Sequence, residues 1–129
     1  MSNKDIHITE AELEILQVLW EKQQATVKEV HEALSDGRDA GYTTTLKQMQ
    51  VMYDKGLLTR DDSRRQHIYF PKADIKKVQR KFMDKVMKNL FSGSAGELVL
   101  NALSNYTTTP EELEQIKLLI DKAKKTKNP

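Results

Sequence analysis

Four copies of one helix-start pattern divide the chain. In each copy, a serine or threonine is followed three residues later by glutamate, at Thr9/Glu12, Thr26/Glu29, Ser94/Glu97 and Thr109/Glu112. Such a pair can form a capping box, in which the hydroxyl and the carboxylate each accept a hydrogen bond from a backbone N–H at the helix start. Pro110 follows Thr109 of the fourth pair, at the first position of the helix, where no backbone N–H donor is needed. The spacing of the four pairs predicts a mainly helical chain.

Apolar residues recur at helical spacing in the first half of the chain. They predict helices from Glu10 to Lys22, from Val27 to Leu34 and from Thr44 to Lys55, with Gly56 ending the third. The segment 35–41, SDGRDAG, is rich in turn formers and predicts a loop. Each helix has one apolar stripe, which in the third consists of Leu46, Met49, Met52 and Tyr53. Short helices of this kind must pack on one another to bury their stripes.

The spacing of apolar residues changes from helical to alternating after Gly56. Residues 58–60 and 67–70 indicate two short strands, joined by the polar turn 61–66 and closed by Pro71. Three helices followed by a hairpin is the order of a winged helix-turn-helix. We therefore expect a mainly α fold in which residues 1–71 form a winged-helix DNA-binding domain.

Three more helices are predicted after Pro71, over residues 74–91, 95–103 and 110–124. Their apolar stripes are wide for so short a segment, so we expect residues 72–129 to form a three-helix dimerisation domain that buries them against a second copy. The alternative is that these helices pack on the first domain of the same chain. The expected dimer contacts are Val78, Phe82, Val86, Leu90, Phe91, Leu98, Leu103, Leu113, Ile116 and Ile120.

Charge is distributed unevenly along a chain whose net charge is only +2. Residues 72–93 hold seven Lys and Arg against two Asp and Glu, whereas residues 1–71 hold nine against twelve. At the start of the third helix, hydroxyl, amide and ammonium groups are suited to phosphates and base edges, and a helix N-terminus favours anions. The predicted DNA contacts are Tyr42, Thr43, Thr44, Thr45, Lys47, Gln48, Arg64 and Arg65. A solvated helix face and a charged turn remain the alternatives for these residues.

Several functional classes find no support in the sequence. The chain has no cysteine, and His7, His31 and His67 do not have metal-ligand spacing. No nucleophile elbow, phosphate-binding glycine loop or zinc-protease motif occurs, so we expect no catalytic residues, no metal and no cofactor. The N-terminus lacks the apolar stretch of a secretory signal, and the longest nearly apolar run, 98–103, is too short to span a bilayer. We therefore expect a cytoplasmic protein with no membrane insertion.

Five stretches of the chain together resemble the penicillinase repressor family of winged-helix transcriptional repressors, which includes methicillin-resistance and copper-homeostasis repressors. The stretches are ITEAELEILQVLW (8–20), TVKEV (26–30), YTTTLKQM (42–49), DKGLL (54–58) and the break at 91–94, and the resemblance covers residues 8–121. It implies a homodimer that represses transcription on a palindromic double-stranded operator. The family's recognition helix falls on residues 42–48 and its wing on Arg64 and Arg65. Without cysteines, the thiolate switch of the copper-responsive branch is not expected.

The resemblance also implies how repression is relieved. Some members are cleaved in the dimerisation arm when a membrane sensor protease pathway detects β-lactams, after the Asn of a stretch like LVLN. Residues 98–101 are LVLN, but Ala102 stands where those members have an aromatic residue after the Asn. The stretch is therefore interpreted either as a cleavage site between Asn101 and Ala102 or as a helix face in the dimer core. Val51 stands where relatives tend to carry Arg, so their operator sequence does not transfer. A protein–protein adaptor whose winged helix does not read DNA is the alternative function.

Overall fold

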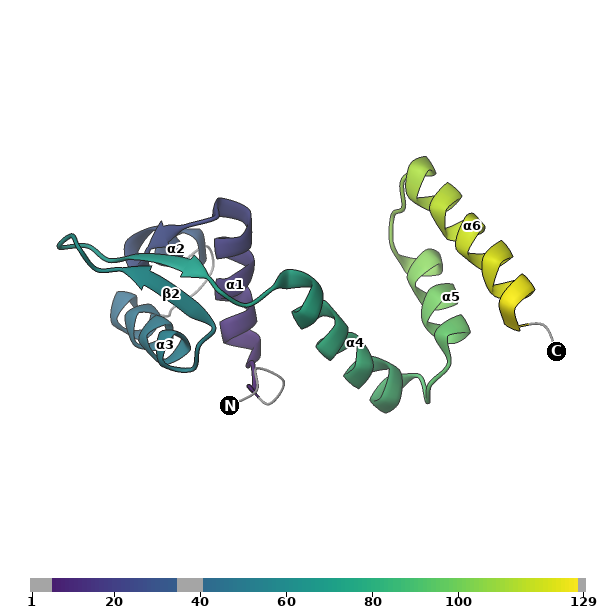
Figure 1. Ribbon diagram of the computed structural model, residues 1–129, viewed down its shortest axis with the longest axis horizontal. Coiled ribbons are helices and arrows are strands. Elements are labelled where there is room, and N and C mark those ends of the chain that lie inside the picture. Colours follow the sequence, from purple (N-terminus) through teal and green to yellow (C-terminus); the bar gives the residue numbers. More distant parts are fainter. Residues whose placement is uncertain (1–5, 35–40, 128–129) are drawn as a thin grey trace. The chain divides into compact units, whose positions relative to one another are not determined.

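The computed structural model describes residues 6–34 and 41–127 (Figure 1). The chain divides into two compact units, Met1–Lys81 and Phe82–Pro129. The elements in order are α1 (Glu10–Lys22), β1 (Ala25–Thr26), α2 (Val27–Leu34), α3 (Tyr42–Asp54), β2 (Leu58–Asp61), β3 (Ile68–Pro71), α4 (Ile75–Leu90), α5 (Ala95–Asn105) and α6 (Pro110–Lys127). The predicted loop 35–41 lies outside the described residues except for Gly41.

The first unit has the winged-helix topology that the sequence predicted. Its antiparallel sheet has the strand order β1-β3-β2, with Tyr69 of β3 opposite Ala25 on one side and Arg60 on the other. The two long strands form the hairpin that projects from the three helices (Figure 1). The strand β1 was not predicted, because two residues are too few to display an alternating pattern. The predicted fold class is confirmed.

Hydrogen bonds at the helix starts account for where the helices begin. Thr9 and Glu12 form a complete capping box at α1, with N···O distances of 3.0 and 3.1 Å. The pairs Thr26/Glu29 and Thr109/Glu112 are also reciprocal. At α5 the Glu97 N–H donates to the Ser94 hydroxyl at 3.1 Å. The four sequence patterns therefore all mark real helix starts.

The core of the first unit lies where α1, α2 and α3 meet the sheet. Its fully buried side chains are Ile15, Leu16 and Leu19 of α1, Val30 of α2, Met49 and Met52 of α3, and Leu58 and Tyr69 of the sheet. The predicted stripe of α3 is wrong in part, because Leu46 is half-buried and Tyr53 is exposed. The inward positions are instead Thr45, Met49 and Met52, which are spaced by four and three residues on one face.

The start of α4 belongs to the first unit. Trp20 Nε1 donates a hydrogen bond to the Ala73 carbonyl at 2.9 Å, and Lys81 Nζ donates to the Ile6 carbonyl. The predicted domain boundary at residue 71 thus falls inside this unit. Val78, expected to be a dimer contact, is only 7% exposed and belongs to the core of this unit, so its contact in a dimer stays a prediction.

The second unit consists of the end of α4 with α5 and α6. The break after α4 places Ser92 and Gly93 in the left-handed region, with φ of 48° and 82°. Within the part of this unit whose side chains are described, residues 82–126, none is buried. Nowhere in residues 6–34 and 41–127 is a helix both long and apolar enough to cross a membrane. The same described residues contain no cluster of three His, Asp or Glu suited to hold a metal ion.

Candidate nucleic-acid interface

The N-terminus of α3 begins without a side-chain cap. Gly41 is the capping residue, with φ of −79° and ψ of 167°, and its carbonyl accepts the N–H of Thr44 and of Thr45 at 3.1 and 3.2 Å. Among residues 6–34 and 41–127, no side chain caps the start of this helix. Unpaired donors and the helix dipole make such an end favourable for phosphate or for base acceptors.

The first turn of α3 is held by α2. His31 Nδ1 lies 3.4 Å from the Thr45 hydroxyl, and the His31 ring meets the Tyr42 ring edge-on at a centroid distance of 6.1 Å. Thr45 is only 4% exposed, which leaves little of its surface for the DNA contact that the sequence predicts. Its hydroxyl lies in the interior because Thr45 is four residues before Met49 and shares the inward face of that residue. Tyr42 keeps an exposed ring at the helix start.

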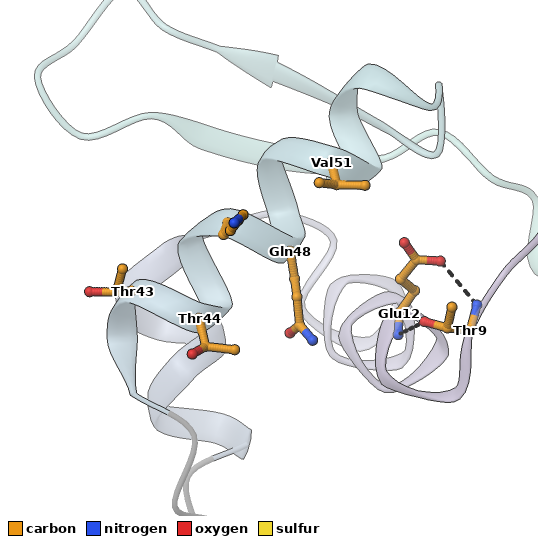
Figure 2. A pocket seen from close by; sticks show the side chains of 7 residues that line it. Thr9, Glu12, Thr43, Thr44, Gln48 and Val51 are labelled. Carbon is orange, nitrogen blue, oxygen red and sulfur yellow. Dashed lines mark hydrogen bonds between the residues drawn. The ribbon is translucent and has the colours of Figure 1, made fainter.

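The outward face of α3 carries most of the other predicted contacts. Thr43, Thr44 and Lys47 are exposed, and Gln48 is half-buried. Figure 2 shows the Gln48 side chain extending from α3 on the side of the helix nearer α1. Together with the start of α1, this face lines a shallow open pocket whose lining residues are Thr9, Glu12, Thr43, Thr44, Lys47, Gln48 and Val51. The sequence did not predict that Thr9, Glu12 and Val51 line this surface, because no local pattern shows which parts of two helices lie side by side.

An ion pair ties the start of α1 to the end of α3. Lys55 Nζ donates to both carboxylate oxygens of Glu12, at 2.8 and 2.9 Å. Burial raises the pKa of Glu12, but the hydrogen bonds from Lys55 and Thr9 outweigh it, so the pKa lies below its ordinary value. Glu12 therefore carries a charge at neutral pH, and the pair fixes α3 relative to the helix beside it.

The hairpin presents its two predicted cations at an exposed turn. Arg64 and Arg65 are both exposed, next to a turn in which the Ser63 N–H donates to Asp61 Oδ1 at 3.0 Å. Hydrogen bonding with Ser63 lowers the pKa of Asp61, and the charges of Arg64 and His67 act in the same direction. The turn is therefore ordered by its own polar groups, which leaves the guanidinium groups directed to solvent.

A contact between β2 and α3 braces the hairpin. The Arg60 guanidinium lies 4.1 Å from the centroid of the Tyr53 ring, and Arg60 Nε lies 3.7 Å from an Asp62 carboxylate oxygen. This stack was not predicted, since Tyr53 had been placed in the core. It explains how Tyr53 is accommodated on the surface: a cation over an aromatic face is favourable even where water reaches it.

The second unit leaves the predicted dimer residues open to solvent. Leu90 is 74% exposed, and Leu103, Leu113 and Ile120 are also exposed. Phe82, Val86, Phe91, Leu98 and Ile116 are half-buried. Further exposed apolar side chains, which the sequence analysis had not assigned to the dimer, are Leu100, Tyr106, Leu118 and Leu119.

The Asn101–Ala102 bond lies inside α5 rather than in a loop. Both residues are exposed, and the Asn105 side-chain amide donates to the Asn101 carbonyl at 2.9 Å and to its side-chain oxygen at 3.2 Å. A protease needs an extended backbone, so cutting here requires local unwinding of the helix.

The chain is similar to a known protein family, to individual members of that family and to a solved structure. A profile of the penicillinase repressor family matches residues 8–122. The methicillin resistance regulatory protein MecI of Mammaliicoccus sciuri is 28% identical over 126 residues, which cover 95% of this chain and 99% of that protein. The penicillinase repressor of Staphylococcus aureus is 26% identical over 128 residues, 97% of this chain and all of that protein. A solution structure of the Bacillus licheniformis repressor BlaI, in monomeric form with the blaP half-operator, aligns with a TM-score of 0.48 and 27% identity over 55% of this chain and 87% of that chain.

Proposed function

Because the chain belongs to the penicillinase repressor family of transcriptional repressors, we propose that it binds a palindromic operator in double-stranded DNA as a homodimer. Residues 1–71, together with residues 72–81 of the same compact unit, act as the DNA-binding domain, and the helices after Lys81 act as the dimerisation domain. The observation that carries the proposal is the exposed polar face of α3, which is supported from behind by buried packing. A protein of this kind works where the DNA is, in the cytoplasm.

The groups on α3 match what a major groove offers. In a winged helix the third helix enters the groove, and residues of its N-terminal half contact base edges. Thr43 and Thr44 bring hydroxyls, Lys47 an ammonium group and Gln48 an amide. Gln suits adenine, Lys suits guanine or phosphate, and the uncapped N–H groups at Tyr42 suit a phosphate. One helix face thus provides both positioning and sequence-reading contacts.

Arg64 and Arg65 supply the second contact of each protomer. They lie at the exposed turn of the hairpin, where a wing reaches the DNA backbone or the minor groove. Their charges add to that of Lys47, so binding is expected to weaken steeply as salt rises.

Exposure of the second unit supports the homodimer. Large apolar side chains remain on the surface of α5 and α6, and none of the residues 82–126 is buried within one chain. A monomer exposing so many apolar residues is unfavourable in water, whereas pairing two identical faces buries them. Two joined copies also present two α3 helices to the two halves of a palindrome.

Binding to the DNA upstream of the chain's own gene tests the proposal. We expect a saturable complex in fluorescence anisotropy, with Lys47→Ala weakening it and lowering its salt dependence. Gln50→Ala is the matched control, because Gln50 is exposed on α3 but lies outside the pocket lining. Equal affinity for the upstream region and for random duplex would contradict sequence-specific repression and favour the adaptor function.

Relief of repression is proposed to occur by cleavage between Asn101 and Ala102, triggered through a membrane sensor protease pathway. The bond is exposed on α5, and its loss would separate α6 from the rest of the dimerisation domain. Incubation with extract from β-lactam-induced cells should release a fragment ending at Asn101, detected by intact-mass spectrometry. An intact chain, under conditions where a known substrate of the pathway is cut, would exclude this route.

A further inference from the structure

We propose that Val51 recognises a thymine through its 5-methyl group, which makes this valine a determinant of operator sequence. The inference rests on the proposed DNA-binding function and assigns part of its specificity. Val51 is 43% exposed, although it is an aliphatic residue two positions from the fully buried Met49 and next to the fully buried Met52. The described residues leave this part of its side chain open, so a contact partner is expected to come from outside the chain.

The position of Val51 continues the proposed reading face. Thr44, Lys47, Gln48 and Val51 follow one another at spacings of three, one and three residues, which places them on one side of α3. All four line the same pocket, and Figure 2 shows Gln48 and Val51 on successive turns of α3. A base pair beside the one contacted by Gln48 therefore comes within reach of Val51 when α3 lies in the groove.

The polar groups beside Val51 are already hydrogen-bonded, which favours an apolar contact at this position. The Glu12 carboxylate also lines the pocket, and its two oxygens are already bonded by Lys55 and by the Thr9 N–H. Lys55 balances the charge of Glu12, and a cytosine amino group would meet carboxylate oxygens that already accept these hydrogen bonds. In the major groove the apolar feature of the base pairs is the thymine methyl, and short aliphatic side chains contact it.

Selection followed by removal of single methyl groups tests the assignment. A randomised duplex library is bound to the full-length protein, and each thymine of the selected operator is replaced in turn by deoxyuridine, which differs only in lacking the methyl. We expect one position in each half-site at which the replacement weakens wild-type binding about fourfold, the effect of one buried methyl. Val51→Ala should bind the thymine and the uracil operators alike at that position.

The controls separate failure of this inference from failure of the proposed function. Gln50→Ala should keep the wild-type thymine preference, because Gln50 lies outside the pocket. If the library yields no preferred sequence, the proposed function itself is wrong. If a sequence is selected but no thymine replacement distinguishes the wild type from Val51→Ala, operator binding stands and the thymine contact is refuted. Tighter binding and a steeper salt slope of Val51→Arg, combined with insensitivity to uracil, would assign the position to a phosphate.

Discussion

Replacing Lys55 by methionine tests whether the Glu12–Lys55 pair holds α3 in place. The change keeps the aliphatic stem of the lysine but leaves a carboxylate that is 8% exposed without its cation. Removing one partner of a fully buried pair costs about 3–5 kcal/mol, whereas exposed pairs contribute about 0–1 kcal/mol. Since the Lys55 side chain is 28% exposed, we expect an intermediate loss of about 2 kcal/mol.

The assay is urea unfolding followed by the fluorescence of Trp20, the single tryptophan of the chain. Its indole N–H bonds the Ala73 carbonyl, so the signal reports on the first unit alone. A loss of about 2 kcal/mol corresponds to a decrease in melting temperature of roughly 10 °C for a unit of this size. Lys28→Met, at an exposed lysine of α2, is the control and should change stability by less than about 0.5 kcal/mol.

The pH dependence of the same variants gives an independent check. The pKa of Glu12 is lower in the folded protein than its ordinary value of 4.5, so its stabilising effect is present above that value and is lost as pH falls through the folded pKa. Glu12→Gln keeps an acceptor for the Thr9 N–H but removes the charge, and should flatten this decrease in acid. The reasoning would be refuted if Lys55→Met were as stable as the wild type. It would also be refuted if the stability losses of Lys55→Met and Glu12→Gln simply added in the variant that carries both changes.

Three further predictions concern binding, assembly and the interior. Replacing Arg64 and Arg65 together by alanine removes four cations from a dimer, and the slope of log K against log salt should decrease by about 3.6 if each meets a phosphate; an unchanged slope would exclude a wing contact. Ile116→Asp should yield a monomer in analytical ultracentrifugation and weaken operator binding at least tenfold, whereas a dimer of wild-type stability would place the interface elsewhere. Thr45→Val should leave operator preference unchanged and reduce stability by about 1 kcal/mol, because its hydroxyl bonds inside the protein; altered base preference would return Thr45 to the reading face.

The winged-helix architecture was predictable because its signals are local. Capping pairs such as Thr9/Glu12 satisfy backbone donors within one helix turn, and the change from helical to alternating spacing after Gly56 depends on neighbouring residues only. The two-residue strand β1 exists only because β3 pairs with it, so it left no pattern. The extension of the first unit to Lys81 depends in the same way on distant partners, since Trp20 meets Ala73.

The candidate interface was predictable in its helix but not in its register. Tyr42 to Gln48 offered the right chemistry, yet the threonine that turns inward could be identified only once α2 had brought His31 beside it. The prediction that Tyr53 is buried was wrong because Arg60 of the next strand stabilises its ring on the surface. The lining by Thr9, Glu12 and Val51 arises where two helices meet, and no spacing within either helix encodes such a meeting.

The most direct test of the account is a hydroxyl-radical footprint of the selected operator together with the stoichiometry of the complex by analytical ultracentrifugation. We expect two chains per duplex and two protected half-sites separated by about 10 base pairs or a multiple of that spacing. One chain per duplex, or protection that does not depend on sequence, would contradict the claim that paired α3 helices read a palindrome.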